Sequence, residues 1–285
     1  MKKTIVSFLC VLLFCALIPS SSLAQGDTVD PPPLTPVDQL VDDKGNIVFN
    51  DSLVESAIRR ALGIPEGPIS KKQLSLLGVN QEELNIISEM ETTADLSILQ
   101  LCTSLKTLNL EKVTPINLSA ITSLKSLNFF SARRINITNL NFLVGIVGLS
   151  DVFIYECPLK DISALVDLPN LILVSIDSYV PDITPLYQCK KLAGVAVSKL
   201  TNRQVNKLLD RIGDRLFSLG LFDCDINDET LVRISKLPLH YFELAYPVLE
   251  VYSIHSIAPI WNMKTLTTLK FYKLQIDSLE GIQQL

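Results

Sequence analysis

Few residues in this 285-residue chain have the types and spacing that catalysis or metal binding requires. Its two histidines, His240 and His255, have no cysteine or second histidine at ligand spacing, and no Cys-x-x-Cys occurs. A serine nucleophile elbow, a His-Glu-x-x-His motif, a phosphate loop and a dinucleotide glycine fingerprint are also missing. Acid pairs such as Asp223 with Asp225 have the pattern of solvated loop charge. We therefore expect no catalytic residue, no metal and no cofactor, and the sequence does not indicate an enzyme.

Four cysteines lie beyond the N-terminal apolar segment, and an even number raises the possibility of disulfides in an exported chain. Cys102 and Cys189 each occupy the middle of a Leu-x-x-Cys-x-x-Leu pattern, where an inward apolar side chain is expected. Cys157 and Cys224 each stand three residues after a strand apolar residue. Such positions favour small buried thiols, so we expect four free cysteines.

The N-terminus has the three parts of a secretory signal: a basic start, an apolar run over residues 5–18 and a small-residue exit that ends at Ala24. The apolar run is shorter than the roughly 20 residues needed to span a bilayer. We expect a signal peptide over residues 1–24, cleavage after Ala24, and no membrane insertion of the mature chain. The protein would be secreted or held at the cell surface, or periplasmic if a second membrane retains it. Residues 25–45 are rich in proline and aspartate and predict a linker.

Composition bounds the remaining possibilities. The chain is 48% hydrophobic, enough for a large core, and its formal net charge of -5 has the wrong sign for nucleic-acid binding.

The rest of the chain is organised by a repeat, seen first in Leu105-x-x-Leu108-x-Leu110. Its recurrence about every twenty-odd residues is the mark of leucine-rich repeats. We predict an α/β fold: a right-handed horseshoe solenoid over residues 96–285 with parallel strands on its concave face. A ninth repeat begins at Leu279 and is incomplete at Leu285. The eight predicted strands have as anchors Leu105-Leu108-Leu110, Leu124-Leu127-Phe129, Leu149-Val152-Ile154, Leu171-Val174-Ile176, Leu192-Val195-Val197, Leu216-Leu219-Leu221, Leu239-Phe242-Leu244 and Leu266-Leu269-Phe271.

Two short amphipathic helices are predicted ahead of the repeats, within a cap and lead-in segment over residues 46–95. The first would begin with a capping box of Ser52 and Glu55, and the second with Ser70 and Gln73. They would cover the apolar end of the first repeat. Residues 78–95 predict only an irregular strand. One return segment, residues 202–216, has helical rather than tighter spacing, and a packed return helix is favoured over a partner-binding one.

The sequence of the predicted cap carries a family resemblance. Residues 47–59, then 61–65 and 69–74, followed by repeats, resemble the helical cap and array of internalin-like bacterial leucine-rich repeat proteins, over roughly residues 47–285. The resemblance implies a secreted or surface-displayed binding protein, without transferring any particular receptor.

Side chains between the inward strand anchors should point to the concave surface, and several are aromatic. Phe130, Phe153 and Tyr155 would form one patch beside charge, typical of contact surfaces for proteins or glycans. Neighbouring side chains could instead cover these aromatics. A smooth stretch including Gly194 and Gly220 would admit a ligand backbone, or relieve crowding where the strands curve. The candidate ligand-binding residues are Phe130, Asp151, Phe153, Tyr155, Asp177, Phe222, Tyr241, Glu243, Lys270 and Tyr272.

These patterns predict a non-enzymatic protein whose concave face binds a protein or glycan partner. Two alternatives remain: a structural or assembly module that docks through the solenoid end, with self-association through the uncapped last repeat, or a targeting domain of a longer surface enzyme. Asn50, Asn117 and Asn136 lie in glycosylation sequences and are expected to be unmodified.

Overall fold

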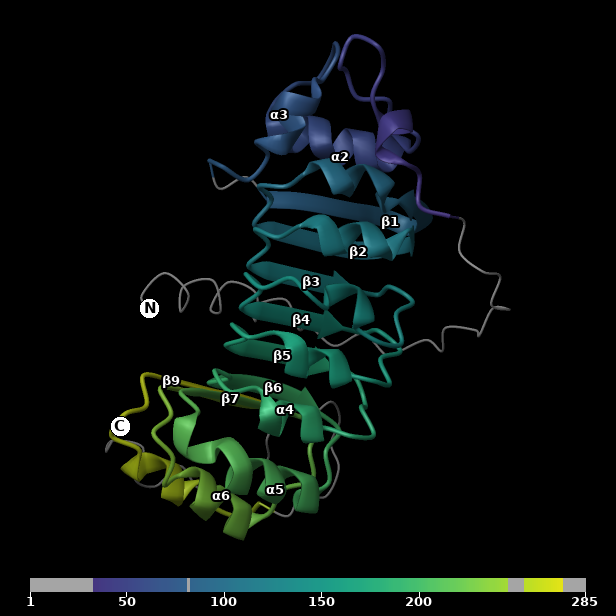
Figure 1. Ribbon diagram of the computed structural model, residues 1–285. Coiled ribbons are helices and arrows are strands. Elements are labelled where there is room, and N and C mark those ends of the chain that lie inside the picture. Colours follow the sequence, from purple (N-terminus) through teal and green to yellow (C-terminus); the bar gives the residue numbers. More distant parts are fainter. Residues whose placement is uncertain (1–32, 81–82, 246–253, 274–285) are drawn as a thin grey trace.

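The computed structural model describes residues 33–80, 83–245 and 254–273, and shows a ladder of strands with helices along one side (Figure 1). Within these described residues, nine strands form one sheet in sequence order from β1 to β9, and every neighbouring pair is parallel. This topology confirms the predicted leucine-rich repeat solenoid. The strands are β1 Glu83–Asp95, β2 Thr107–Ile116, β3 Phe129–Arg133, β4 Asp151–Tyr155, β5 Leu173–Asp177, β6 Gly194–Ser198, β7 Ser218–Phe222, β8 Tyr241–Ala245 and β9 Thr268–Tyr272.

The described sheet has one strand more than the eight that were predicted, because the lead-in segment itself forms a long strand, β1. β1 pairs with β2 through most of its 13 residues, with a bulge between Ile87 and Thr92. Leu84 and Ile86 point into the core and are fully buried, as the apolar alternation of an ordinary repeat requires. The solenoid therefore begins ahead of the first recognisable leucine repeat.

Return segments on the opposite side of the core are mostly short 3-10 helices, as repeats of this length allow. The predicted return helix is confirmed as α5, which a capping box of Thr201 and Gln204 begins. The return elements are η3 Leu96–Leu101, η4 Leu118–Ser123, η5 Asn141–Leu143, η6 Ser163–Asp167, α4 Thr184–Gln188, α5 Asn202–Ile212, η7 Gly213–Arg215, α6 Asp228–Ile234 and η8 Ala258–Asn262. We call the sheet face opposite to them the concave face.

Every predicted strand anchor except Phe129 of β3 points into the core. The predicted anchors of β3, with Leu127 followed by Phe129, are wrong by three positions. Leu108 is paired with Phe130 and Leu110 with Ala132, so Phe130 is an inward residue with no exposed surface, and Phe129 faces the concave side. Leu124 and Leu127 are both fully buried, so the motif fits the sequence in two registers. In the observed register Leu105, Leu127, Leu149 and Leu171 follow at intervals of 22 residues.

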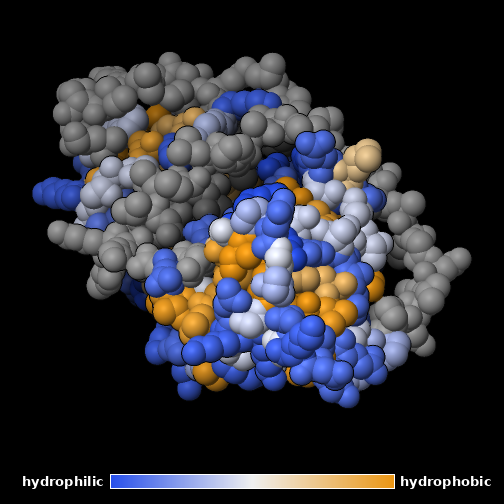
Figure 2. Space-filling view, turned by 90° about the horizontal axis from the view of Figure 1, so that it is seen from above, coloured by the Kyte–Doolittle hydropathy of each residue, from blue (hydrophilic) through white to orange (hydrophobic). Residues whose placement is uncertain are grey.

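A cap covers the β1 end of the sheet, with α2 Ser52–Leu62 against β1 and with α3 Lys71–Ser75 and η2 Val37–Leu40 beside it (Figure 1). The capping box of Ser70 and Gln73 is confirmed. The box of Ser52 and Glu55 is wrong, because Asp51 is the N-cap and accepts from the Val54 amide. Glu55 pairs instead with Arg59, at 2.8 Å. Viewed down onto the cap end, hydrophobic residues form separate patches among hydrophilic ones (Figure 2).

A left-handed residue recurs at the same register position of most repeats: it directly follows β3, β4, β6, β7 and β9, and it lies within β2. Lys112, Arg134, Glu156, Lys199 and Asp223 have φ between 52° and 59°, and Lys273 has φ 54°. Each holds a conformation that costs an L-residue about 1–2 kcal/mol.

Some predictions concern residues that the structure does not describe. They are the signal peptide, its cleavage site, residues 25–32 of the linker and the incomplete ninth repeat.

Candidate binding surface

The sheet register arranges the concave side chains in three rows that run across the strands. The first row holds Thr107, Phe129, Asp151, Leu173, Gly194, Ser218, Tyr241 and Thr268. The second holds Asn109, Ser131, Phe153, Ser175, Ala196, Gly220, Glu243 and Lys270. The third holds Glu111, Arg133, Tyr155 and Asp177, then Ser198, Phe222, Ala245 and Tyr272. Nine of the ten predicted binding residues therefore share this face, and Phe130 does not.

The concave aromatics form a second hydrophobic cluster, separate from the main core. Phe153, Tyr155, Leu173 and Tyr241 are buried in it, with exposed fractions of 7% or less. The Phe129 and Phe153 rings meet edge to face at 5.0 Å between centroids. This packing agrees with the alternative raised from the sequence, that neighbouring side chains cover these aromatics; the strand pattern alone predicts direction and not burial. More accessible aromatics on this face are half-buried Phe129 and Phe222, and Tyr272, which is 43% exposed.

A charged group of Glu111, Arg133, Arg134 and Glu156 lies beside this cluster, within β2 and at the carboxyl ends of β3 and β4. Arg133 lies 3.7 Å from Glu111 and 2.9 Å from Glu156, and Arg134 lies 2.7 Å from Glu156. Burial opposes ionisation of Glu156, but the hydrogen bonds and charges of the two arginines outweigh it and lower the pKa of that carboxyl. In the predicted register of β3, Arg133 was not among the concave residues. In the observed register, its position opposite Glu111 could have been read from the 22-residue spacing.

At the β8 end of this face, Glu243 is 1% exposed and accepts a hydrogen bond from the Tyr241 hydroxyl. The Lys270 ammonium lies 5.4 Å from the centre of the Tyr241 ring. Burial raises the pKa of Glu243 despite the opposing effects of that hydrogen bond and of Lys270. The folded chain thus binds this proton more tightly than the unfolded chain, so stability falls as pH rises from the ordinary carboxyl pKa through the raised one.

The other two predicted acids have different surroundings. Asp151 is 8% exposed, and burial raises its pKa although the Ser150 hydroxyl donates to it. Asp177 is half-buried and accepts from the Ser198 hydroxyl at 2.7 Å. These acids sit on different strands and are not brought together as a catalytic pair.

The small residues in the middle of the face fill space that strand curvature restricts. A Cβ on Gly194 would lie 2.2 Å from Leu173 Cδ2, and one on Gly220 would lie 2.9 Å from Ala196 Cβ. Contacts this short favour relief of crowding over an open track for a ligand backbone.

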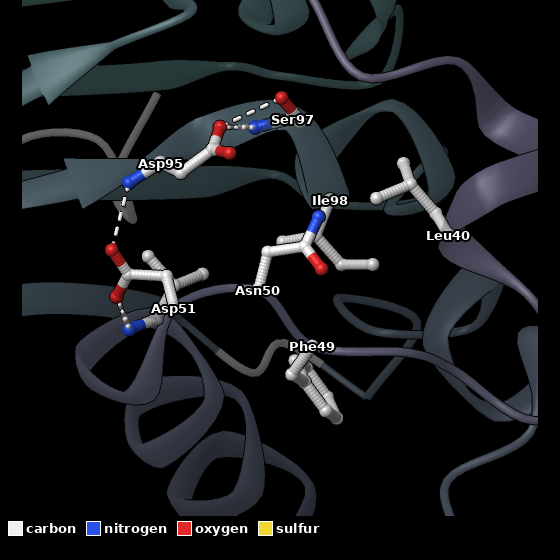
Figure 3. A pocket seen from close by; sticks show the side chains of 8 residues that line it. Leu40, Phe49, Asn50, Asp51, Asp95, Ser97 and Ile98 are labelled. Carbon is white, nitrogen blue, oxygen red and sulfur yellow. Dashed lines mark hydrogen bonds between the residues drawn. The ribbon is translucent and has the colours of Figure 1, made fainter.

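A polar network that the sequence did not predict joins the cap to the array (Figure 3). Asp51 accepts from the Asp95 amide at 2.9 Å, and Asp95 accepts from the amide and hydroxyl of Ser97. Burial disfavours the Asp95 carboxylate, but its bonds to Ser97 and Asn117 prevail and lower its pKa. The small cavity beside these residues is lined also by Leu40 and other cap residues. This network fixes the cap and offers little room for a ligand.

Asn117 shows why one glycosylation sequence is poorly available. Its side-chain nitrogen donates to Asp95 and to Ser97, both at 2.9 Å, and the residue is 7% exposed. An enzyme that modifies this nitrogen would have to break both bonds.

All four described cysteines are free and buried, as expected. Burial raises the pKa of Cys157 and Cys224 to about 12 and that of Cys189 to about 11, and raises that of Cys102 as well. The Cys157 thiol lies 3.2 Å from the Tyr155 carbonyl oxygen, and the Cys224 thiol lies 3.5 Å from that of Phe222. Each of these two thiols thus donates a hydrogen bond to a backbone carbonyl oxygen at the turn that follows a strand.

The residues that could do chemistry remain dispersed. His255 lies at the surface with its Nδ1 3.2 Å from the Asp228 carboxylate, at the start of α6. Within the described part of the chain, no three histidine, cysteine or acidic residues gather as a metal site. No helix within the described ranges is long and apolar enough to cross a membrane.

The fold defines a leucine-rich repeat solenoid with an N-terminal helical cap, and in this respect the chain is internalin-like. Among solved structures, it is similar to internalin C2 of Listeria monocytogenes, with 17% identity and a TM-score of 0.59, covering 86% of this chain and all 100% of that one. An internalin F of the same organism gives 15% identity and a TM-score of 0.42, covering 84% of this chain and 94% of that chain. A leucine-rich repeat protein of Leptospira interrogans gives 19% identity and a TM-score of 0.48, over 71% of this chain and 51% of that one. No family model and no curated protein matches the sequence.

Proposed function

We propose that this protein is a secreted or cell-surface binding protein without enzymatic activity, whose concave face recognises a protein partner. The observation that carries the proposal is the end of that face formed by β2 to β5, where aromatic side chains adjoin a charged group. Half-buried Phe129 lies one strand from Glu111 and on the same strand as Arg133. Rigid aromatics and arginine are the side chains that contribute most to protein interfaces. A glycan partner is the alternative ligand on the same surface.

The internalin-like fold supports this proposal, because a repeat sheet presents one continuous surface for a partner. A leader over residues 1–24 would deliver the chain outside the cytoplasm. N-terminal sequencing of the exported protein should find Gln25 as its first residue. Retention of Met1 on protein recovered from the medium would contradict that cleavage.

The test pairs a concave variant with a control variant that lies outside the concave face. Residues 25–285, labelled with biotin, would be applied to an array of purified extracellular proteins and to a glycan array. For any protein hit, Phe129→Ser with Arg133→Ser should weaken binding at least tenfold, whereas Lys71→Gln with Lys160→Gln should leave it unchanged. Both variants should keep the circular dichroism spectrum of the parent chain. A glycan hit that the concave variant loses, without any protein hit, or equal loss with both variants, would overturn the proposal.

A second candidate is docking through the β9 end of the solenoid, and partial exposure there favours it. Leu269 and Phe271 are only partly buried, whereas their counterparts in β7, Leu219 and Leu221, are fully buried. Apolar surface at a solenoid end is a contact surface. Sedimentation velocity should then show concentration-dependent dimers that Leu269→Asn abolishes, and a monomer at all concentrations would exclude self-association. In a longer surface enzyme, the same array would act as the targeting domain.

A further inference from the structure

A row of basic residues lies on the return-segment side of the solenoid, away from the proposed binding face. Cations recur every fourth residue along α5 and its flanks, in an acidic chain of net charge -5. Because residues four apart lie on the same side of a helix, Arg203, Lys207 and Arg211 form one row about 6 Å apart. All three side chains belong to exposed residues. The basic row consists of Arg203, Lys207 and Arg211 on α5, with Lys199 before the helix and Arg215 after it in η7, and Lys190 and Lys191 follow α4.

Contacts with α4 place the row on the side of α5 that faces this neighbour. The Lys207 ammonium lies 5.9 Å from the centre of the Tyr187 ring. Arg215 donates to the carbonyl oxygen of Lys190 at 3.2 Å. Burial raises the pKa of Tyr187, Asp182 raises it further, and the positive charge of Arg211 opposes that rise. The row therefore surrounds one half-buried tyrosine.

Two of the nearby acids, Asp210 and Asp182, have their polar partners outside this row. Asp210, on the other side of α5, is paired with Arg233 of α6. Asp182 accepts from the amide and hydroxyl of Thr184, at 2.9 and 3.0 Å. Asp214 is exposed. Among the described residues, none of the five cations of the row takes part in an ion pair within 4.0 Å.

We propose that the basic row on α5 is a second binding surface, which holds a linear anionic polysaccharide. Arginines contribute most to protein interfaces where they pack into buried central pockets, and stable attachment to a membrane takes apolar or lipid anchors in addition to basic residues. Among the described residues, the row has a ring contact with Tyr187, which is half-buried beneath Lys207. A row of exposed cations without such anchors fits a polymer with repeating carboxylates, which arginine binds through its paired N–H groups. Export of the chain, as proposed above, would place it among polysaccharides and away from nucleic acids.

The probe is polygalacturonate immobilised on a sensor, tested with residues 25–285 over a salt series. Arg203→Gln with Lys207→Gln and Arg211→Gln should weaken binding at least tenfold and flatten its dependence on salt. Glutamine keeps helix propensity, so the melting temperature should not change. Lys71→Gln with Lys72→Gln and Lys160→Gln removes the same charge elsewhere and should retain the parental affinity.

Several outcomes would overturn this proposal. They are an absence of binding to polygalacturonate at low salt, equal loss in both triple variants, and stronger binding to anionic phospholipid vesicles or to duplex DNA. Binding to an acidic protein on the array, lost only in the α5 variant, would assign the row to a protein instead. None of these results depends on the concave face, because its residues are unchanged in both variants.

Discussion

Two adjacent phenylalanines, Phe129 and Phe130, give the sharpest test of the register of the third strand. Phe130 has no exposed surface and meets the Phe142 ring edge to face at 5.6 Å in the main core. Replacing it with alanine removes a buried ring and leaves a cavity, so the free energy of unfolding should fall by about 3–5 kcal/mol. Phe129 is half-buried on the concave face, so Phe129→Ala should cost about 1–2 kcal/mol.

Urea unfolding followed by circular dichroism would measure both variants, with the m-value checked against that of the parent chain. An unchanged m-value shows that the same surface becomes exposed, and that the midpoints compare stability alone. The alternative register, with Phe129 inward, predicts the opposite order. A larger loss for Phe129→Ala than for Phe130→Ala would therefore refute the observed pairing of β2 with β3. Of the two variants, only Phe129→Ala should also weaken binding of a partner at the concave face.

Three further predictions follow from crowding, charge and burial. Gly220→Ala should destabilise the fold by about 1–3 kcal/mol in urea, because the new Cβ would meet that of Ala196 at 2.9 Å; an unchanged midpoint would contradict this crowding. Glu243→Gln should raise the melting temperature at pH 7, because burial disfavours the Glu243 carboxylate and glutamine carries no charge. The decrease in melting temperature between pH 4 and 7 should also become smaller, whereas a larger decrease would show that the folded chain favours the carboxylate. The four described thiols should react with a thiol reagent at pH 8 only after unfolding, and rapid reaction of the native chain would contradict their burial.

Repeat spacing accounts for most of what could be predicted here. Apolar residues at fixed intervals must face one core, which determines strand direction, the parallel sheet and the side on which the returns lie. The α5 helix and its burial were readable for the same reason, from Val205, Leu208, Leu209 and Ile212. The lead-in strand β1 was less clear, because its bulge interrupts the alternation after Ile87.

Register was decided by pairing between strands and not by the local motif. Leu124 and Leu127 both satisfy the leucine pattern, and two consecutive phenylalanines leave either one available as an anchor. Pairing with β2 and β4 places Phe130 beside Leu108 and Val152, and a slip of one residue would turn every side chain of β3 to the other face. The same shift brings Arg133 beside Glu111 and forms the charged group.

The amino-acid sequence by itself determined the leucine-rich repeat solenoid, its cap and the residues available to each face, because these follow from periodicity along the chain. Tertiary structure alone decided which concave side chains are accessible. Whether Phe153 or Tyr155 is exposed depends on neighbours one or more repeats away, such as Phe129 and Leu173, and on how closely the curved strands bring them together. Alternation specifies where a side chain points, whereas burial is a property of the assembled sheet.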